Sequence, residues 1–147
     1  MTTHWTQQPP LVTADDVTRR VEELIGAAVT EQIWYLMTDA DGLQLPVLPS
    51  VETIPEPEPG LVGNLVHIVD DILDSSAPGG RVVFVLERPG AVVPTDRDVT
   101  WADALRPECL RQSVHCAGIY SSTEIGVRLI PPTPGRAQSV GPVPRAR

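Results

Sequence analysis

The chain has 147 residues, a hydrophobic content of 41% and a formal net charge of −8 at pH 7. A chain of this length is expected to form one domain with a substantial hydrophobic core. All eleven cationic residues are Arg, which excludes lysine chemistry such as a Schiff base or a phosphate-binding P-loop. The acidic balance also opposes binding to nucleic acid phosphates and to anionic lipids.

The sequence predicts a central domain between two segments of different composition. Residues 1–12 show no periodicity and are expected to form a flexible arm, while residues 13–130 are expected to form a single α/β domain. Residues 131–147 hold five Pro, three Arg and no acidic residue, a composition typical of a disordered, basic tail. No apolar run has the length of a membrane span and the N-terminus lacks the pattern of a signal peptide, so we expect a cytoplasmic protein.

The first predicted element is an amphipathic helix over residues 14–29. Thr13 and Asp16 have the spacing of a capping box, with Asp in place of the usual Glu. Apolar residues then recur every three or four positions, which predicts one buried helical face.

A hairpin is predicted next. Residues 33–38 are rich in β-branched and aromatic side chains, and residues 43–51 return as a second strand after the D-A-D-G turn at 39–42. Pro46 and Pro49 cannot donate to a ladder, so the second strand is expected to be an edge strand or an interrupted one. The D-A-D-G segment also resembles the start of a calcium-binding loop, but the remaining calcium ligands are missing, so a simple turn is favoured.

The second half of the domain alternates between helices and strands. Helices are expected over 61–73 and 95–112, and strands over 81–87, 114–121 and 126–130. The continuous apolar run of 81–87 is typical of a central strand that is covered on both faces. The complete order is α-β-β-α-β-α-β-β, which predicts an α/β (or α+β) domain with a mixed sheet of about five strands and three helices.

The stretch from Gly80 to Asp98 is the predicted functional corner, because α/β domains commonly bind ligands where a strand passes through a loop into a helix. Glu87, Arg88 and Asp98 lie there, but the stretch contains no His, Cys or Lys. Thr95 and Asp98 also have capping-box spacing, and a helix cap accounts for both residues without a functional role.

The element order and the spacing of this loop resemble the JAB/MPN metalloprotease fold, most closely its bacterial RadC-like branch. The segment VVFVLERPG stands where that family has V-x-L-V-H-N-H-P-S-G, and VPTDRD stands where it has T-P-S-x-x-D. The similarity covers roughly residues 13–130 and lies in order and spacing more than in identity. The resemblance implies the fold of that family.

The resemblance also identifies what this chain lacks. In the family, two histidines and the Asp hold zinc, and Asp98 matches that Asp. Alignment on the Pro of the first motif places Leu86 and Arg88 at the histidine positions, whereas alignment on Asp98 places Val85 and Glu87 there. Neither alignment supplies an imidazole, and zinc needs about three N, S or O ligands from the protein. We therefore expect a degenerate site without a metal or other cofactor.

The two cysteines, Cys109 and Cys116, are expected to be buried structural thiols. A disulfide is not expected in a reducing cytosol, and their spacing is not that of a zinc site. His115 adjoins Cys116, but neighbours on a strand point to opposite faces, so the two cannot form a catalytic dyad.

Two hypotheses of function are consistent with these observations. The first is a non-catalytic, JAB/RadC-like domain that acts through contacts with a protein partner, and its edge strand also allows a homodimer. The second is an enzyme of unrecognised class that uses Glu87, Arg88, Asp96 and Asp98, with His115 as a general acid or base from the next strand. Neither hypothesis involves a cofactor, nucleic acid or a membrane.

Overall fold

The structure, a computed structural model, describes residues 9–25, 28, 30–52, 56–90, 95–124 and 126–132. Most of the predicted N-terminal arm and nearly all of the predicted tail lie outside these residues. The elements are α1 (Ala14–Ile25), β1 (Gln32–Thr38), β2 (Ser50–Glu52), α2 (Pro59–Ser76), β3 (Arg81–Glu87), α3 (Asp96–Arg111), β4 (Cys116–Thr123) and β5 (Gly126–Leu129). Their order confirms the predicted α/β class with three helices and a mixed sheet of five strands.

The sheet has the strand order β2-β1-β3-β4-β5. The pair β3 and β4 is parallel, and the other neighbouring pairs are antiparallel. As predicted from its apolar run, β3 is the central strand, and six of its seven residues are buried. Parallel strands place their carboxyl ends at the same edge of a sheet, so β3 and β4 both end beside the start of α3.

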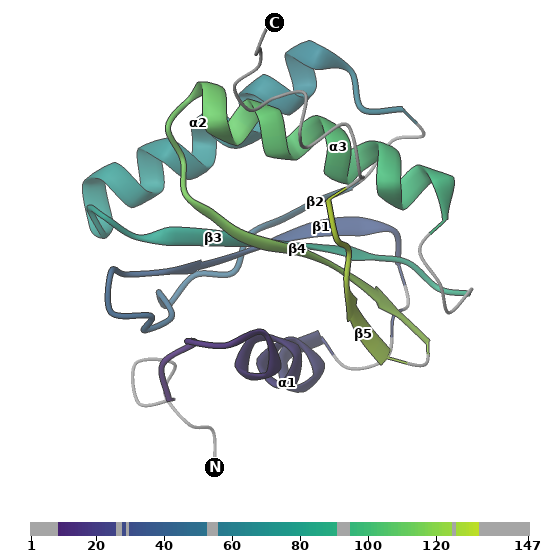
Figure 1. Cartoon of the computed structure of the whole chain (residues 1–147), viewed down its shortest axis with the longest axis horizontal. Helices are drawn as coiled ribbons and strands as arrows, with labels where there is room; N and C mark the ends of the chain where they lie inside the picture. Colours follow the sequence, from purple (N-terminus) through teal and green to yellow (C-terminus); the bar gives the residue numbers. More distant parts are fainter. Residues whose placement is uncertain are drawn as a thin grey trace, which may run out of the picture.

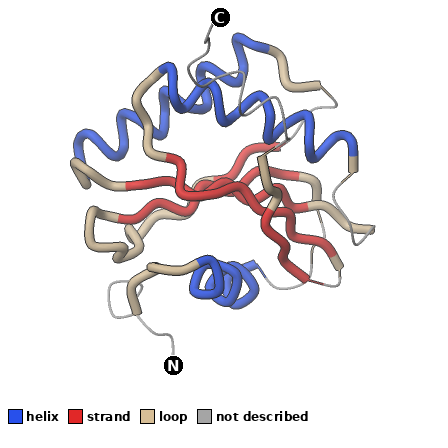
Figure 2. The backbone as a smooth tube through the Cα atoms, in the orientation of Figure 1, coloured by secondary structure: helices blue, strands red, loops and turns tan. Residues whose placement is uncertain are grey.

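The sheet lies between two helical layers, with α1 on one face and α2 and α3 on the other (Figures 1 and 2). Alternation along β3 supplies both cores. Val82, Phe84 and Leu86 pack in the core beneath α2 and α3, whereas Val83 and Val85 pack in the smaller core beneath α1. Glu87, the last residue of β3, therefore points toward the α1 face.

Two predicted strands have different bounds in the structure. The second strand of the hairpin is expected over residues 43–51, but β2 covers only Ser50–Glu52, and Gln44 makes an isolated bridge to Thr38. Pro46 and Pro49 account for the interruption, because a prolyl nitrogen cannot donate to the ladder. On the other side of the sheet, β4 extends to Thr123, two residues beyond its predicted end. The backbone N–H of Arg88 donates to the carbonyl of Ser122 at 2.9 Å and keeps this extension paired with the end of β3.

The helices are close to their predicted bounds. The first begins as expected after a reciprocal cap, in which Asp16 Oδ2 accepts from the Thr13 N–H at 2.9 Å and Thr13 Oγ1 accepts from the Asp16 N–H at 3.1 Å. The described part of α1 ends at Ile25; residues 26, 27 and 29 of its predicted last turn lie outside the described residues, and Ala28 is not helical. The second helix is longer than predicted and begins at Pro59, whose fixed φ suits the first position of a helix.

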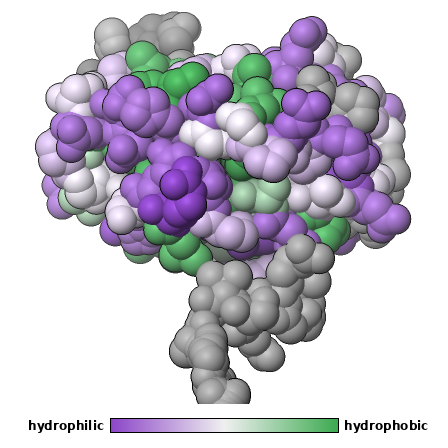
Figure 3. Space-filling model, turned by 90° about the horizontal axis from the view of Figure 1, so that it is seen from above, coloured by the Kyte–Doolittle hydropathy of each residue, from purple (hydrophilic) through white to green (hydrophobic). Residues whose placement is uncertain are grey.

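The outer surface of α2 and α3 is mainly polar. Figure 3, viewed from this side, shows apolar side chains interspersed with polar ones. Ile68 on α2 and Leu110 on α3 are the large apolar residues of these helices that are exposed. None of the described helices has both the length and the apolar character needed to span a membrane.

Candidate functional site

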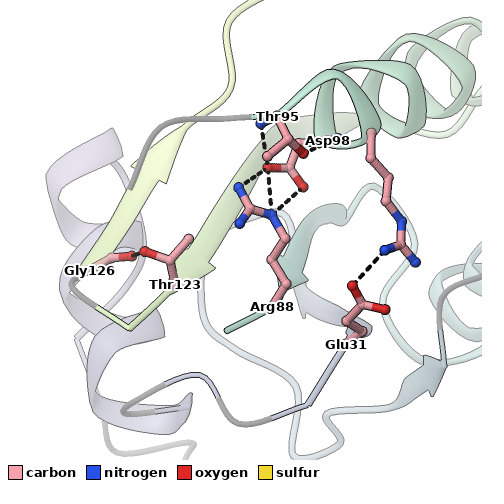
Figure 4. A network of polar contacts seen from close by, with 7 residues as sticks. Glu31, Arg88, Thr95, Asp98, Thr123 and Gly126 are labelled. Carbon is pink, nitrogen blue, oxygen red and sulfur yellow. Dashed lines mark hydrogen bonds and ion pairs between the residues drawn. The ribbon is translucent and has the colours of Figure 1, made fainter. Parts of the chain in front are cut away.

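The predicted corner lies between the end of β3 and the start of α3. The loop residues 91–94 lie outside the described residues, but both sides of the corner are described. Arg88 follows the last residue of β3, and Thr95 directly precedes α3 (Figure 4). Because Glu87 and Arg88 are consecutive on an extended chain, their side chains diverge to opposite faces of the sheet.

Asp98 forms a capping box with Thr95 at the start of α3. Its Oδ2 accepts from the backbone N–H of Thr95 at 3.0 Å, and Thr95 Oγ1 accepts from the Asp98 N–H at 3.3 Å. The helix cap predicted from the spacing of these two residues is therefore present. It satisfies a free N–H of the first turn and places a carboxylate where the helix dipole favours a negative charge.

The same carboxylate forms a buried ion pair with Arg88. The Nε of Arg88 lies 3.1 and 3.0 Å from the two oxygens of Asp98, and Nη2 lies 2.6 Å from Oδ2 (Figure 4). Both side chains are almost fully buried, with 10% and 4% of their surface exposed. This fork-to-carboxylate geometry is among the strongest charge-assisted contacts in proteins. Both oxygens of Asp98 are therefore engaged by Arg88.

Glu87 is engaged on the other face of the sheet. Its Oε1 accepts from the indole Nε1 of Trp34 at 2.7 Å and from Nε2 of Gln32 at 2.8 Å. Its Oε2 also lies 3.4 Å from the backbone nitrogen of Thr30. Since Gln32 is the register partner of Glu87 in the antiparallel β1–β3 pair, the carboxylate joins the end of the central strand to the start of β1.

The remaining predicted residues do not join a common centre. Asp96 is an exposed residue of the first turn of α3, and its neighbour Arg97 pairs with Glu31 at 2.5 Å. His115 is exposed at the opposite end of the sheet, where its carbonyl accepts from the N–H of Val82 near the start of β3. The length of β3 therefore separates His115 from the corner.

The corner has little free space. Its cavity measures only about 10 Å³ and is lined by Glu31, Leu86, Glu87, Arg88, Arg97, Asp98 and Trp101. A volume of this size is about what one water molecule needs. The described side chains of the corner therefore leave little free space between them.

A much larger pocket lies at the other end of α3, where no sequence motif indicates a site. Its volume is about 660 Å³, and its lining residues are Arg106, Cys109, Leu110, Ser113, Val114, His115, Cys116 and Gly118. The sequence predicts two buried structural thiols here. In the structure Cys109 is buried and Cys116 is partly buried, both line this pocket, and both are free thiols. The sequence feature that could have indicated this pocket is the position of Cys109 and Cys116 on either side of a predicted turn between a helix and a strand.

Comparisons with known proteins leave the function to be inferred from these two regions. No protein-family model matches the sequence, and no curated protein is significantly similar to it. Among the residues that the structure describes, no three His, Cys, Asp or Glu side chains form a group that could hold a metal ion.

Proposed function

We propose that this protein is a non-catalytic, JAB/RadC-like α/β domain that acts by binding a protein partner. The observation that carries the proposal is the buried pair of Arg88 and Asp98. The carboxylate that the resemblance assigns to a metal is held instead by a guanidinium, with three N–O contacts of 2.6 to 3.1 Å. The positive charge that zinc would supply is thus provided by the chain itself.

This exchange of a metal for an arginine has a simple electrostatic basis. A dication bound by Asp98 would lie within a few ångströms of the Arg88 guanidinium, and like charges at that distance repel strongly in a buried site. Alignment on the Pro of the family motif places Arg88 at a histidine position, so its contact with Asp98 supports the proposal of a degenerate site. Arg88 thus pairs with Asp98 at the position where the family would place a zinc ligand.

The enzyme hypothesis is less well supported by the same geometry. General acid–base chemistry needs its groups within about 3 Å of one reacting centre or bridged to it by one water. Glu87 contacts Trp34 and Gln32 on one face of the sheet, whereas Asp98 contacts Arg88 on the other. His115 lies at the far end of β3. Glu87 and Asp98 line one cavity of about 10 Å³ but make these contacts on opposite faces of the sheet, and His115 does not line that cavity.

The surface that best suits a protein partner is the outer side of β5. This strand is at the edge of the sheet, and no strand among the described ranges pairs with its outer side. The N–H of Ile130 donates to Ile119, so residues 126, 128 and 130 face β4. In an antiparallel ladder the intervening residues, Val127 and Leu129, then direct their backbone groups outward. An extended segment of a partner can pair with them as an added strand.

Metal analysis tests the first part of this proposal. Purified wild-type protein is expected to contain less than stoichiometric zinc by elemental analysis, and its melting temperature should not change with a chelator or with added zinc. The Asp98→Asn variant is the matched control. Stoichiometric zinc in the wild type that disappears in Asp98→Asn would overturn the proposal of a site occupied by arginine.

A cross-linking experiment tests the second part. A photo-activated amino acid at position 129 is expected to form one discrete adduct with a partner protein in cell extract, while the same group at Ile68 on α2 should not. Val127→Pro removes an outward N–H without removing a bond to β4, and it should abolish the adduct while the melting temperature stays within a few degrees of wild type. An adduct that persists in Val127→Pro, or no adduct at all, would refute binding at the β5 edge.

A further inference from the structure

The pocket at the end of α3 has the size and setting of a small-molecule site. Its volume of about 660 Å³ lies within the range of pockets that bind small ligands. It is formed by the last turns of α3, the connection that leads away from it, and the start of β4. It lies at the opposite end of β3 from the corner, so a site in this pocket is independent of the proposed partner binding.

The fold brings the two thiols of the chain together in this pocket. Cys109 is on α3 with 1% of its surface exposed, and Cys116 is the first residue of β4 and is partly buried. The N–H of Val114 donates to the carbonyl of Cys109 at 2.8 Å and holds the connection against the helix. Both thiols line the pocket, and the Cys116 thiol donates to the carbonyl oxygen of Gly118 at 3.5 Å.

The two thiols have different protonation behaviour. The neighbouring Cys109 thiol lowers the pKa of Cys116, and the positive charge of Arg106 acts in the same direction, against the opposing effect of burial. The Cys116 thiol and burial both raise the pKa of Cys109. The negative charge is therefore favoured on Cys116, the cysteine that is only partly buried as a residue. Thiolates are the nucleophilic form of cysteine, and a nearby Arg favours them.

Arg106 adds an unused hydrogen-bond donor. Its Nη2 donates to the carbonyl oxygen of Ile130, while its Nη1 is buried without a hydrogen-bond partner among the described residues. Burial lowers the pKa of this guanidinium, but an arginine stays charged at neutral pH. A buried cationic donor without an acceptor is costly. A ligand carboxylate entering the pocket would supply that acceptor after a small movement of the side chain.

We propose that Cys116 and Cys109 are a redox-active thiol pair that reacts with a small, carboxylate-bearing disulfide held by Arg106. The Cys116 thiolate attacks one sulfur of the disulfide, forms a mixed disulfide and releases one small thiolate, which takes up a proton. Cys109 then loses its proton, attacks the Cys116 sulfur and releases the second small thiol. The protein dithiol is oxidised to a Cys109–Cys116 disulfide, and one small disulfide is reduced to two thiols.

Oxidised glutathione is a suitable probe because it is a disulfide with several carboxylates. The full-length reduced protein is mixed with it, quenched with acid and examined by intact mass and peptide mapping. Wild type is expected to form the Cys109–Cys116 disulfide, and Cys109→Ser should instead keep one glutathionyl group on Cys116. The wild-type reaction should be at least about tenfold faster than that of the same protein unfolded in urea, because only the folded pocket lowers the pKa of Cys116.

The matched control for the nucleophile is Cys116→Ser, in which buried Cys109 should stay unmodified. Glutathionylation of Cys109 in that variant at the wild-type rate would refute the assigned order of attack. If a serine variant does not fold, peptide mapping of the wild type at early times still decides the question. Mixed disulfide on Cys116 that precedes the internal disulfide is expected, and an unreactive wild type would refute the proposal.

Arg106→Gln tests the ligand class separately. Loss of a charged hydrogen bond to the carboxylate should slow the reaction with oxidised glutathione about tenfold. The reaction with the neutral reagent hydroxyethyl disulfide should slow much less, because that reagent has no carboxylate. Equal slowing with both reagents would contradict a role for Arg106 in binding the carboxylate. Arg106 would then affect only the reactivity of the Cys116 thiol.

Discussion

The two ends of α3 differ in how their charged groups are satisfied. At its start, Arg88 and Asp98 contact one another through several atoms, and the free volume is only about 10 Å³. At its end, Arg106 has a buried nitrogen without a hydrogen-bond partner among the described residues, two thiols are free, and the pocket measures about 660 Å³. One helix thus has a closed end and an open end.

This difference reverses the usual arrangement of α/β proteins. Ligands commonly bind beyond the carboxyl ends of the strands, beside the start of a helix. Here that position is occupied by the ion pair, and the open pocket lies beside the amino end of β4. The location of a fold's usual site is therefore not enough to find the reactive groups of a particular chain.

The largest expected effect is on the closed end. Arg88→Met should lower the free energy of unfolding by about 3–5 kcal/mol, because it leaves the carboxylate of Asp98 buried without its counter-charge. Urea unfolding measures the loss. The double variant with Asp98→Asn should recover part of it, since the amide is neutral and keeps an acceptor for the Thr95 N–H. A loss below about 1 kcal/mol, the value for an exposed pair, would show that this end is not closed.

A smaller effect is expected on the opposite face of the same corner. Glu87→Ala removes the acceptor for the Trp34 indole and the Gln32 amide, and should cost about 1–3 kcal/mol in urea unfolding. Glu87→Gln keeps one acceptor oxygen and should cost less. If Ala and Gln are equally destabilising, the charge of Glu87 matters more than its hydrogen bonds, and the assignment of Glu87 as a link between strands is wrong.

The smallest effect is expected at the open end. Arg106→Met removes a hydrogen bond to Ile130 but also removes a buried donor without a partner, so the free energy of unfolding should fall by only about 1 kcal/mol. The direct comparison is with Arg88→Met in the same buffer. Equal losses for the two arginines would remove the distinction between a closed and an open end of α3.

Most of the fold is encoded in local patterns of the sequence. The run RVVFVLE predicts a central strand with its bounds, and the spacing of Thr95 and Asp98 predicts the start of α3. The error is largest for the second strand of the hairpin. The alternation of residues 43–51 favours a strand, but Pro46 and Pro49 limit it to Ser50–Glu52, and sequence alone does not give the relative weight of these effects.

The site is less predictable because its contacts are distant in sequence. Glu87 and Arg88 are predicted in one corner, but their partners differ, since Trp34 is 53 residues from Glu87 while Asp98 is ten residues from Arg88. The first contact depends on the β1–β3 register, which no local pattern specifies. The pocket of Cys109 and Cys116 depends on where α3 ends and β4 begins, and element boundaries are the least reliable part of sequence-based prediction.

The pairing of β1 with β3 has a consequence for how the chain folds. Gln32 meets Glu87 across 55 residues, with α2 in the connection. Loop closure over such a distance slows folding relative to a local hairpin. During synthesis from the N-terminus, β1 can find β2 early, but its other edge stays unpaired until residues 81–87 have left the ribosome. In that interval the Ile33–Met37 stretch, later buried in two cores, has an unpaired apolar edge that can pair with another chain.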